Sequence, residues 1–377
     1  MKKVIVLGSG MVGSAMAIDM AHQHRVTLID IDKKVLEKAK QKCSSLDIQQ
    51  MDVTNADALH KMIKPYDLVI CAVPGFLGFE TIKTVINTGM NLVDISFFPE
   101  NPLDLDALAK KKKVTAIVDC GVAPGMNNLI AGYYNEKMKI NSLVCLVGGL
   151  PKVKKWPFSY KASFSPVDVI EEYTRPARFI KNGQIVTKEA LTDCETIEFE
   201  HVGTLEAFNS DGLRSLIDTL PHIPDMKEKT LRYPGHIEYI KVLKKSGFFS
   251  REPIDLKGTK VIPLDFTSKV LFKDWKLGEE EEEITIMRII IKGKNEKGEF
   301  REIEYNLYDE YSAETQTSSM ARTTGYTATA AANMFLDGLF SQKGVFPPEL
   351  IGKHEACFSY IMNYLEERNV HYVMSSI

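Results

Sequence analysis

The sequence predicts an α/β protein built on two sheets, first a doubly wound parallel sheet and then an α+β domain with a large mixed or antiparallel sheet. Through residues 1–122, short apolar runs alternate with helical patterns, which is typical of parallel strands joined by crossover helices. Between 123 and 320, hairpin signals replace that alternation. Residues 321–377 contain two helical patterns with no linker before them, and we expect these helices to return to the first domain. The three predicted units are therefore 1–122, 123–320 and 321–377.

A glycine turn follows the first predicted strand. The apolar run at 4–7 leads into a Gly-x-Gly-x-x-Gly pattern, which is followed by an apolar helix and a second strand that ends at Asp30. The first glycine allows a tight turn, the second lets the backbone approach a pyrophosphate, and the third lets the helix pack on its strand. The helix N-terminus attracts the phosphates. This context predicts a Rossmann dinucleotide-binding domain with a turn that contacts the cofactor through Gly8, Ser9, Gly10, Met11, Val12 and Gly13.

Asp30 bears on the choice of dinucleotide. A carboxylate at the end of the second strand accepts a hydrogen bond from the ribose 2′-hydroxyl of NAD and repels the 2′-phosphate of NADP. Lys33 and Lys34 are close by and could neutralise a phosphate, although at the start of a solvated helix they need no such role. We therefore expect NAD, with NADP as the less favoured cofactor.

Further strands of the first domain are predicted at 67–75, 91–96 and 115–121. In doubly wound sheets, ligands bind beyond the carboxyl ends of the strands. The residues expected along the cofactor cleft are therefore Ala72, Val73, Pro74, Gly75, Asp94, Ser96, Asp119 and Cys120.

Asp52 and Val53 follow the third predicted strand, at the place where adenine edges usually rest. Asp52 is therefore a candidate acceptor for the adenine amino group. Equally, Asp52 and Thr54 fit the cap of a turn or helix.

The second domain shows hairpin and helix signals. Asn182-Gly183 predicts a tight hairpin turn, and the runs 284–292 and 300–308 predict a second, longer hairpin. Helical patterns occur at 212–220 and 236–246, and at 323–339 and 356–367 near the C-terminus. The acidic run 279–283 favours a solvated loop before a strand.

Composition favours an ordinary globular protein that acts on small molecules. Apolar residues make up 44% and charged residues 26% of the chain, and the net charge of −3 gives no reason to expect a nucleic acid or a membrane as partner. The six cysteines are scattered, with no metal-binding spacing, and no metal is expected. The first strand starts so early that it leaves no room for a cleavable signal, and no apolar run is long enough to span a bilayer, so we expect a cytoplasmic protein.

Several blocks of the chain resemble the saccharopine dehydrogenase superfamily. They lie at 118–128, 147–151, 160–166, 230–236 and 319–325. Three further blocks, at 74–78, 98–102 and 171–178, are similar to the bacterial and archaeal lysine 6-dehydrogenase branch. The resemblance extends in order over nearly the whole chain. It implies a Rossmann domain, a substrate domain, C-terminal helices that return to the first domain, and oxidation of a carbon–nitrogen bond.

One position separates the branches. Glutamate-forming saccharopine enzymes carry Gly-Leu-Asp-Pro-Gly where this chain has Gly-Val-Ala-Pro-Gly at 121–125, so Ala123 lacks the carboxylate expected to face saccharopine. The resemblance therefore implies NAD-dependent oxidation of L-lysine or a related amino acid at its ε-amine. The products would be an aldehyde that closes to Δ1-piperideine-6-carboxylate, NADH and ammonia.

Such a reaction needs a proton acceptor, because a lysine ammonium has a pKa of about 10.4. The candidate bases are Asp94, Asp119 and Lys161. Either aspartate would equally suit a structural role in a loop, and Lys161 would equally suit binding of a carboxylate or phosphate. His236 could shuttle protons, although a lone histidine at a helix start is more often a cap or a packed ring.

The substrate carboxylate needs a cation, and a guanidinium matches it bidentately. Arg214 and Arg232 are the best matches to family motifs, with Arg322 third; a structural arginine paired with an acid is the alternative for each. Tyr160 and Ser96 are candidates to supply hydroxyls to the substrate.

Two other functions stay open. One is saccharopine dehydrogenase of the glutamate-forming type, and the other is a dinucleotide-binding sensor with no catalysis. Long strands with exposed edges favour pairing between subunits, so we expect a homodimer or homotetramer.

Overall fold

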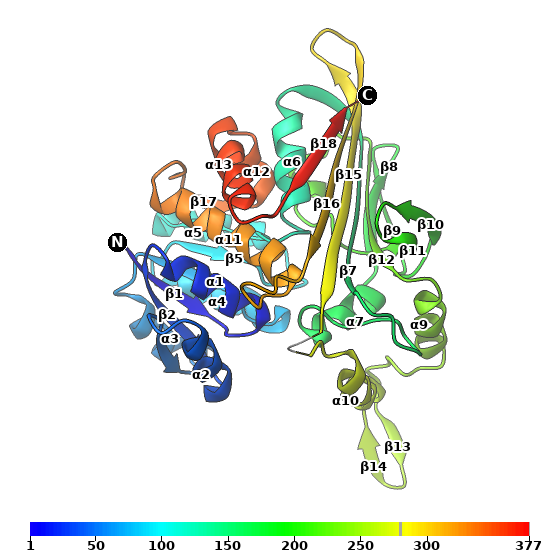
Figure 1. Ribbon diagram of the computed structural model, residues 1–377, viewed down its shortest axis with the longest axis horizontal. Coiled ribbons are helices and arrows are strands. Elements are labelled where there is room, and N and C mark those ends of the chain that lie inside the picture. Colours follow the sequence, from blue (N-terminus) through cyan, green and yellow to red (C-terminus); the bar gives the residue numbers. More distant parts are fainter. Residues whose placement is uncertain (279–280, 377) are drawn as a thin grey trace.

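The computed structural model describes residues 1–278 and 281–376, and two sheets organise them (Figure 1). The N-terminal sheet is parallel throughout, with the strand order β17-β6-β5-β4-β1-β2-β3. Its strands are β1 (Lys3–Leu7), β2 (Arg25–Asp30), β3 (Asp47–Gln50), β4 (Leu68–Cys71), β5 (Leu92–Asp94), β6 (Thr115–Ile117) and β17 (Gly344–Phe346). Its helices are α1 (Met11–Ala21), α2 (Lys33–Lys42), α3 (Ala56–Ile63), α4 (Gly75–Asn87), α5 (Asp106–Lys112) and the 3₁₀ turn η1 (Pro102–Leu105). The predicted doubly wound sheet is confirmed.

Close backbone approach explains the glycines of the first turn. Gly8 has φ of 103°, and a Cβ there would lie 2.4 Å from the Ala72 carbonyl oxygen. A Cβ on Gly13 would lie 2.0 Å from the Gly8 carbonyl oxygen, so α1 packs on β1 only because position 13 is glycine. A Cβ on Gly10 would meet no protein atom within 4 Å, which leaves open space in front of the α1 N-terminus.

The second sheet is mixed and has long central strands. Its path is β10-β11-β12-β7-β15-β16-β18, with β8 and β9 beside β12; β12 and β7 are parallel and the other pairs antiparallel. The strands are β7 (Met138–Pro151), β8 (Ala177–Lys181), β9 (Gln184–Lys188), β10 (Glu195–Phe199), β11 (Gly203–Asn209), β12 (Asp225–Arg232), β15 (Glu283–Asn295), β16 (Phe300–Glu310) and β18 (Tyr372–Ser376). The helices of this part are α6 (Met126–Asn135), α7 (Pro166–Thr174), α8 (Leu216–Thr219), α9 (His236–Lys245) and α10 (Pro263–Trp275), and a small hairpin of β13 (Ile254–Leu256) and β14 (Thr259–Val261) projects beyond α10.

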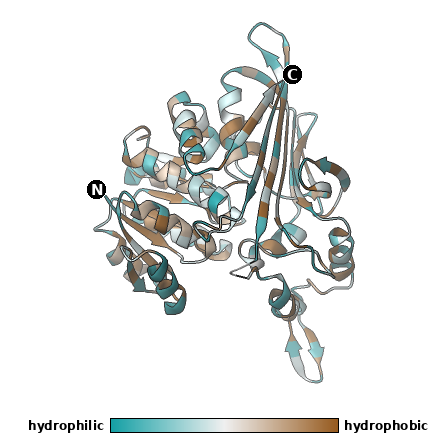
Figure 2. Cartoon of the chain, viewed as in Figure 1, coloured by the Kyte–Doolittle hydropathy of each residue, from teal (hydrophilic) through white to brown (hydrophobic). Residues whose placement is uncertain are grey.

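Hydropathy follows this layout (Figure 2). Apolar residues fill the strands of the N-terminal sheet, whereas the outer helix α2 is hydrophilic. In the central strand β4 every residue is buried, as expected for a strand covered by helices on both faces.

Both hairpin predictions are confirmed. Asn182 and Gly183 join β8 to β9 with φ of 51° and 75°, the left-handed conformation that an Asn-Gly turn provides. Strands β15 and β16 form the long second hairpin.

The predicted helix at 212–220 is wrong in length, because only α8 (Leu216–Thr219) is helical. A Cβ on Gly212 would lie 1.4 Å from Glu228 Oε1, so the chain there is held against β12. Arg214 has φ of 45° and is buried in an ion pair. Tertiary contacts therefore override the helical pattern before Ser215.

The C-terminal helices return to the first domain as predicted. They are α11 (Ser319–Leu336), α12 (Pro348–Gly352) and α13 (Glu355–Glu366). Helix α11 packs on α1, and Asp19 of α1 accepts hydrogen bonds from Tyr364 at 2.7 Å and Arg368 at 2.8 Å. Two strands were not predicted in this segment. Strand β17 extends the first sheet and β18 pairs with β16 in the second sheet, so this segment ties the two sheets together.

The acidic run predicted as a solvated loop has a different role at its end. Positions 279–280 lie outside the described residues. Glu283 begins β15 and is 1% exposed, and its carboxylate accepts the backbone N–H groups of Ser319 at 2.9 Å and Met320 at 2.6 Å. The interpretation as a solvated loop is therefore wrong for Glu283, which caps the N-terminus of α11.

Candidate active site

A cleft of about 680 Å³ lies between the carboxyl ends of the N-terminal strands and the second sheet. The glycine turn, the ends of β2, β4 and β5, and residues 121–124 line it from the first domain side. Strands β7 and β12, helix α7 and the start of α11 line it from the other side. We call the part at the glycine turn and Asp30 the nucleotide half, and the part at α7 and β12 the substrate half.

The nucleotide half contains most of the predicted cofactor residues. The whole turn from Gly8 to Gly13, Asp30, and the segment from Ala72 to Pro74 line the cleft. Gly75 is buried at the start of α4, where a Cβ would lie 2.4 Å from the Phe97 carbonyl oxygen. Together with the open space before Gly10, these features fit a dinucleotide with its pyrophosphate on α1.

The Asp30 carboxylate is held in place by two backbone groups. It accepts the N–H of Ser9 at 2.7 Å and the N–H of Asp32 at 2.8 Å. Lys38 and Lys42 line the same half of the cleft, whereas Lys33 and Lys34 are not among its lining residues.

Four predicted cofactor residues lie outside the cleft lining, namely Gly75, described above, and Asp52, Val53 and Cys120. Asp52 is exposed, and its Oδ1 accepts both the backbone N–H of Thr54 at 2.9 Å and its hydroxyl at 2.7 Å. These bonds lower the pKa of Asp52 and correspond to the turn cap that was the alternative interpretation. Val53 packs against the first-domain core, and Cys120 is a buried thiol with a pKa raised by burial.

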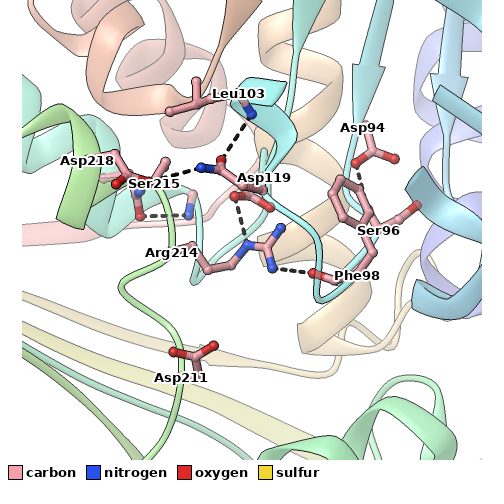
Figure 3. A network of polar contacts seen from close by, with 12 residues as sticks. Asp94, Ser96, Phe98, Leu103, Asp119, Asp211, Arg214, Ser215 and Asp218 are labelled. Carbon is pink, nitrogen blue, oxygen red and sulfur yellow. Dashed lines mark hydrogen bonds and ion pairs between the residues drawn. The ribbon is translucent and has the colours of Figure 1, made fainter. Parts of the chain in front are cut away.

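The predicted bases Asp94 and Asp119 belong to a buried polar cluster behind the cleft wall (Figure 3). Asp94 is fully buried, its Oδ2 accepts the Ser96 N–H at 3.2 Å, and burial raises its pKa to about 8. Arg214 Nε donates to Asp119 Oδ2 at 2.8 Å, and Arg214 Nη1 donates to the Phe98 carbonyl. Of these five residues only Ser96 lines the cleft, and its hydroxyl has no hydrogen-bond partner among the described residues.

Arg214, the first choice for the substrate carboxylate, is thus buried in an ion pair with Asp119. Its side chain is 3% exposed and that of Asp119 is 1% exposed. This arrangement corresponds to the structural alternative that the sequence left open.

Arg232, Tyr160 and His236 form a second buried cluster. The Arg232 guanidinium lies 4.5 Å over the Tyr160 ring, and its Nε donates to the Tyr173 hydroxyl at 2.9 Å. His236 Nε2 contacts the same hydroxyl at 2.9 Å, and burial, followed by the charge of Arg232, lowers its pKa to about 3. Arg232 lines the cleft, but Tyr160 and His236 do not. His236 is a neutral packed ring, which was the alternative interpretation.

Lys161 and Arg322 are also paired away from the cleft lining. Lys161 Nζ lies 3.2 Å from Glu281 Oε2. Arg322 Nη2 lies 3.1 Å from Asp309 Oδ1. Of these four residues, only Glu281 lines the cleft.

The sequence analysis missed the charged face of α7. Residues at spacings of three and four along this helix and its C-cap line the cleft, namely Asp168, Glu171, Glu172 and Arg175. Burial raises the pKa of Asp168 to about 6. The helical spacing of these charges was visible in the sequence, but a solvated helix face gives the same pattern.

Strand β12 contributes a second missed carboxylate. Glu228, Thr230 and Arg232 alternate along the strand and line the cleft, while Lys227 and Lys229 point to its other face, where they line a separate cavity. Asn127 Nδ2 donates to Glu228 Oε2 at 3.3 Å, and burial raises the pKa of Glu228 to about 8. A polar residue at every second position of a strand was the signal available.

Carboxylates outnumber cations in the substrate half among the described residues. The six acids are Asp168, Glu171, Glu172, Asp211, Glu228 and Glu281, and the three cations are Arg175, Arg232 and Lys276. Arg232 Nη2 donates to Glu172, which satisfies part of its guanidinium. Three further acids pair with cations outside the lining: Glu171 with Arg251, Asp211 with Arg178 and Glu281 with Lys161. Among the described residues of the substrate half, Asp168 and Glu228 are therefore the lining acids in no ion pair, and they suit contact with a ligand ammonium.

Among the described residues, no group of three histidine, cysteine or acidic side chains is placed to hold a metal ion. None of the described helices has the length and hydropathy needed to cross a bilayer.

Comparison with known proteins gives matches over both domains. The saccharopine dehydrogenase NADP binding domain matches residues 4–117, and the saccharopine dehydrogenase C-terminal domain matches residues 121–370. Alpha-aminoadipic semialdehyde synthase of Rattus norvegicus is 24% identical over 92% of this chain, which spans only 45% of the length of that protein. Carboxyaminopropylagmatine dehydrogenase of Synechocystis sp. is 22% identical, and the match covers 93% of this chain and 92% of that protein.

The fold recurs in a solved structure. Apo saccharopine dehydrogenase (L-Glu forming) from Saccharomyces cerevisiae superposes with a TM-score of 0.80 at 20% identity, over the full length of both chains.

Proposed function

We propose that this chain, which belongs to the saccharopine dehydrogenase superfamily, oxidises the ε-amine of L-lysine with NAD⁺ and releases NADH and ammonia. Members of the family are dehydrogenases that bind a nicotinamide dinucleotide and act on carbon–nitrogen bonds of small amino-acid substrates. The finer assignment, to the lysine 6-dehydrogenase type of reaction, is our proposal. The aldehyde product closes on its own α-amine to Δ1-piperideine-6-carboxylate.

The charge of the substrate half carries the choice of lysine. Lysine has two ammonium groups and one carboxylate, whereas saccharopine has three carboxylates. Asp168 and Glu228 line the cleft and are in no ion pair among the described residues, which favours the ligand with more ammonium groups. Ala123, which lines the cleft, adds no carboxylate of its own next to the nucleotide.

The proposed sequence of events starts with removal of a proton from the lysine ammonium. Glu228 lines the cleft, and its pKa is raised to about 8, so its deprotonated form accepts this proton and increases as pH rises through 8. A nicotinamide bound in the nucleotide half would supply the hydride acceptor for oxidation of the substrate Cε. Water then attacks the resulting imine, and ammonia leaves. Asp94, Asp119 and Lys161 remain predictions as bases, and none of the three lines the cleft.

NAD is the proposed cofactor, because the Asp30 carboxylate lies at the ribose end of the nucleotide half and its two backbone hydrogen bonds hold it there. The matching domain is described as NADP binding, and Lys38 and Lys42 also line this half, so kinetics with NAD⁺ and with NADP⁺ test the preference.

Glutamate-forming saccharopine dehydrogenase is the second candidate. It is favoured by the similarity to the yeast structure and by the two guanidiniums, Arg175 and Arg232, which suit a ligand with more than one carboxylate. A cofactor-binding sensor is the third, and binding of dinucleotide with no turnover would support it.

The test is absorbance at 340 nm with purified protein, NAD⁺ or NADP⁺, and either L-lysine or saccharopine at alkaline pH. We expect NADH and ammonia to form from lysine and NAD⁺. NADH formation with saccharopine alone would contradict the lysine assignment, and no reaction with either would favour the sensor.

We also propose that the protein is cytoplasmic and forms a homodimer or homotetramer. Strand β18 lies at one edge of the second sheet, and its Val373 and Met374 are 65% and 50% exposed. Light scattering that finds a monomer at micromolar concentration would contradict the oligomer.

A further inference from the structure

Arg175 has an environment that sets it apart from Arg232, the other arginine among the described lining residues of the cleft. It follows α7 directly, lines the cleft, and has a side chain that is 12% exposed. Its Nε and Nη1 have no hydrogen-bond partner among the described residues. Its Nη2 lies 3.7 Å from Glu171 Oε2, which is longer than a hydrogen bond. A largely buried guanidinium with so few hydrogen bonds is costly unless an anion binds it.

The neighbours of Arg175 position it without satisfying it. Its guanidinium carbon lies 4.5 Å from the centre of the Phe97 ring, and that of Arg214 lies 5.2 Å from the centre of the same ring. Arg214 is neutralised by Asp119, whereas the nearest acid to Arg175 makes only the long contact described above. The Phe97 ring therefore fixes the plane of a guanidinium whose Nε and Nη1 are unpaired among the described residues, while Glu171, Asp211 and Asp168 act on its charge without a hydrogen bond to it.

The location favours a substrate carboxylate over a cofactor phosphate. Phe97 lies just beyond the carboxyl end of β5, and α7 belongs to the substrate half. The phosphates of a dinucleotide belong at the N-terminus of α1, on the glycine turn. Arg232, the other guanidinium in the lining, already donates to Glu172 and Tyr173.

We propose that Arg175 binds the α-carboxylate of the amino-acid substrate and thereby selects amino acids over amines that lack a carboxylate. This inference rests on the proposed function, because it takes lysine as the substrate. Arg175 is a specificity-determining residue here: it holds the substrate end remote from the oxidised carbon.

The test compares L-lysine with 1,5-diaminopentane, which is lysine without its carboxylate. For Arg175→Gln we expect kcat/KM for lysine to fall by about 30-fold or more, mainly through KM, because a bidentate charge-assisted contact is lost. For 1,5-diaminopentane we expect kcat/KM, or the inhibition constant where turnover is too slow, to stay within about threefold of wild type. Arg175→Lys keeps the charge, so we expect its kcat/KM for lysine to lie between those of wild type and Arg175→Gln. If Arg175→Gln does not fold, Arg175→Lys is the variant that tests the proposal.

Arg251→Gln is the matched control. Arg251 is an exposed arginine that contacts Glu171 from outside the cleft at 2.8 Å. This variant therefore also disturbs Glu171, but kcat/KM for lysine and for 1,5-diaminopentane should stay at the wild-type value. NADH binding, followed by fluorescence, should be the same in all variants.

Several outcomes would overturn the role of Arg175 while leaving the lysine reaction in place. They are an equal loss for lysine and 1,5-diaminopentane, no loss for either, or a loss of NADH affinity. A wild-type enzyme that oxidises saccharopine but not lysine overturns the proposed function instead. In that case a raised KM for saccharopine in Arg175→Gln still supports a carboxylate contact, and an unchanged KM rejects it. A wild-type enzyme that is inactive with both substrates overturns both proposals.

Discussion

The nucleotide half of the cleft is shaped by closely packed backbone, whereas charged side chains converge in the substrate half. Gly8 and Gly13 bring β1, α1 and the Ala72 backbone together so closely that no side chain fits between them. In the substrate half, acids and arginines from α7 and β12 converge, and burial shifts the pKa of several of them. The nucleotide half depends on the close approach of backbone segments, and the substrate half depends on the arrangement of charged side chains. Substitutions in the two halves should therefore have different effects on stability, binding and activity.

The largest expected effect is in the nucleotide half, for Gly13→Ala against Gly10→Ala. The new Cβ at position 13 would lie 2.0 Å from the Gly8 carbonyl oxygen, so we expect both a lower melting temperature and a loss of NADH binding. At position 10 the Cβ meets no protein atom within 4 Å, so stability should stay near wild type.

Binding should nevertheless fall by about tenfold or more in Gly10→Ala, because the pyrophosphate approaches there. Thermal denaturation and NADH fluorescence check the pair. Equal stability losses at the two positions would contradict the contrast between packing and ligand contact.

A smaller but still large effect is expected in the substrate half for Glu228→Gln. Loss of a positioned base should lower kcat/KM for lysine by about 100-fold. Burial raises the pKa of Glu228 from 4.5 to about 8, so its basic form increases as pH rises through 8, and wild-type activity should rise with it. The variant should lack this inflection in the pH profile.

Asp94→Asn sharpens this prediction. Burial also raises the pKa of Asp94 to about 8, but Asp94 is fully buried behind Ser96. If Asp94→Asn removes the inflection and Glu228→Gln keeps it, the base is Asp94, one of the three candidates predicted from the sequence.

The same pKa shift of Glu228 has a consequence for stability. Between pH 4.5 and about 8 the folded protein binds this proton more tightly than the unfolded chain does, so its contribution to stability decreases as pH rises through that window. Glu228→Gln should therefore be less sensitive than wild type to the change from pH 5 to pH 9 in thermal denaturation. An identical pH dependence in the two proteins would argue against a raised pKa.

Asp30→Asn should have an intermediate effect, confined to the choice of cofactor. Removing the charge takes away repulsion of a 2′-phosphate, so the ratio of kcat/KM for NAD⁺ over NADP⁺ should fall by about tenfold. Steady-state kinetics at saturating lysine measure it. A wild-type preference for NADP⁺ would show that Lys38 and Lys42 outweigh Asp30 in this half.

Asp52→Asn should have the smallest effect. Asp52 is exposed and bonds only within its own turn, to Thr54, so we expect an unchanged KM for NAD⁺ and a stability change within about 0.5 kcal/mol. A tenfold rise in KM for NAD⁺ would restore the prediction that this carboxylate contacts adenine.

The sequence by itself determined the nucleotide half, because its determinants are local. One strand, one turn, one helix and one acid within thirty residues predict the parallel sheet, the glycine contacts and the place of Asp30, and the structure has them in that order. The Asn182-Gly183 hairpin followed from local turn chemistry in the same way.

Only the tertiary structure decided which charged groups face the cleft. Asp119 and Arg214 are 95 positions apart, and their pairing removed the arginine that sequence motifs favoured for the carboxylate. Arg175, in turn, faces the cleft because α7 packs against the segment after β5, and Glu228 does so because of its register in β12. A charge pattern on a helix or strand is the same whether it meets water or a ligand. Only the fold decides which face is enclosed.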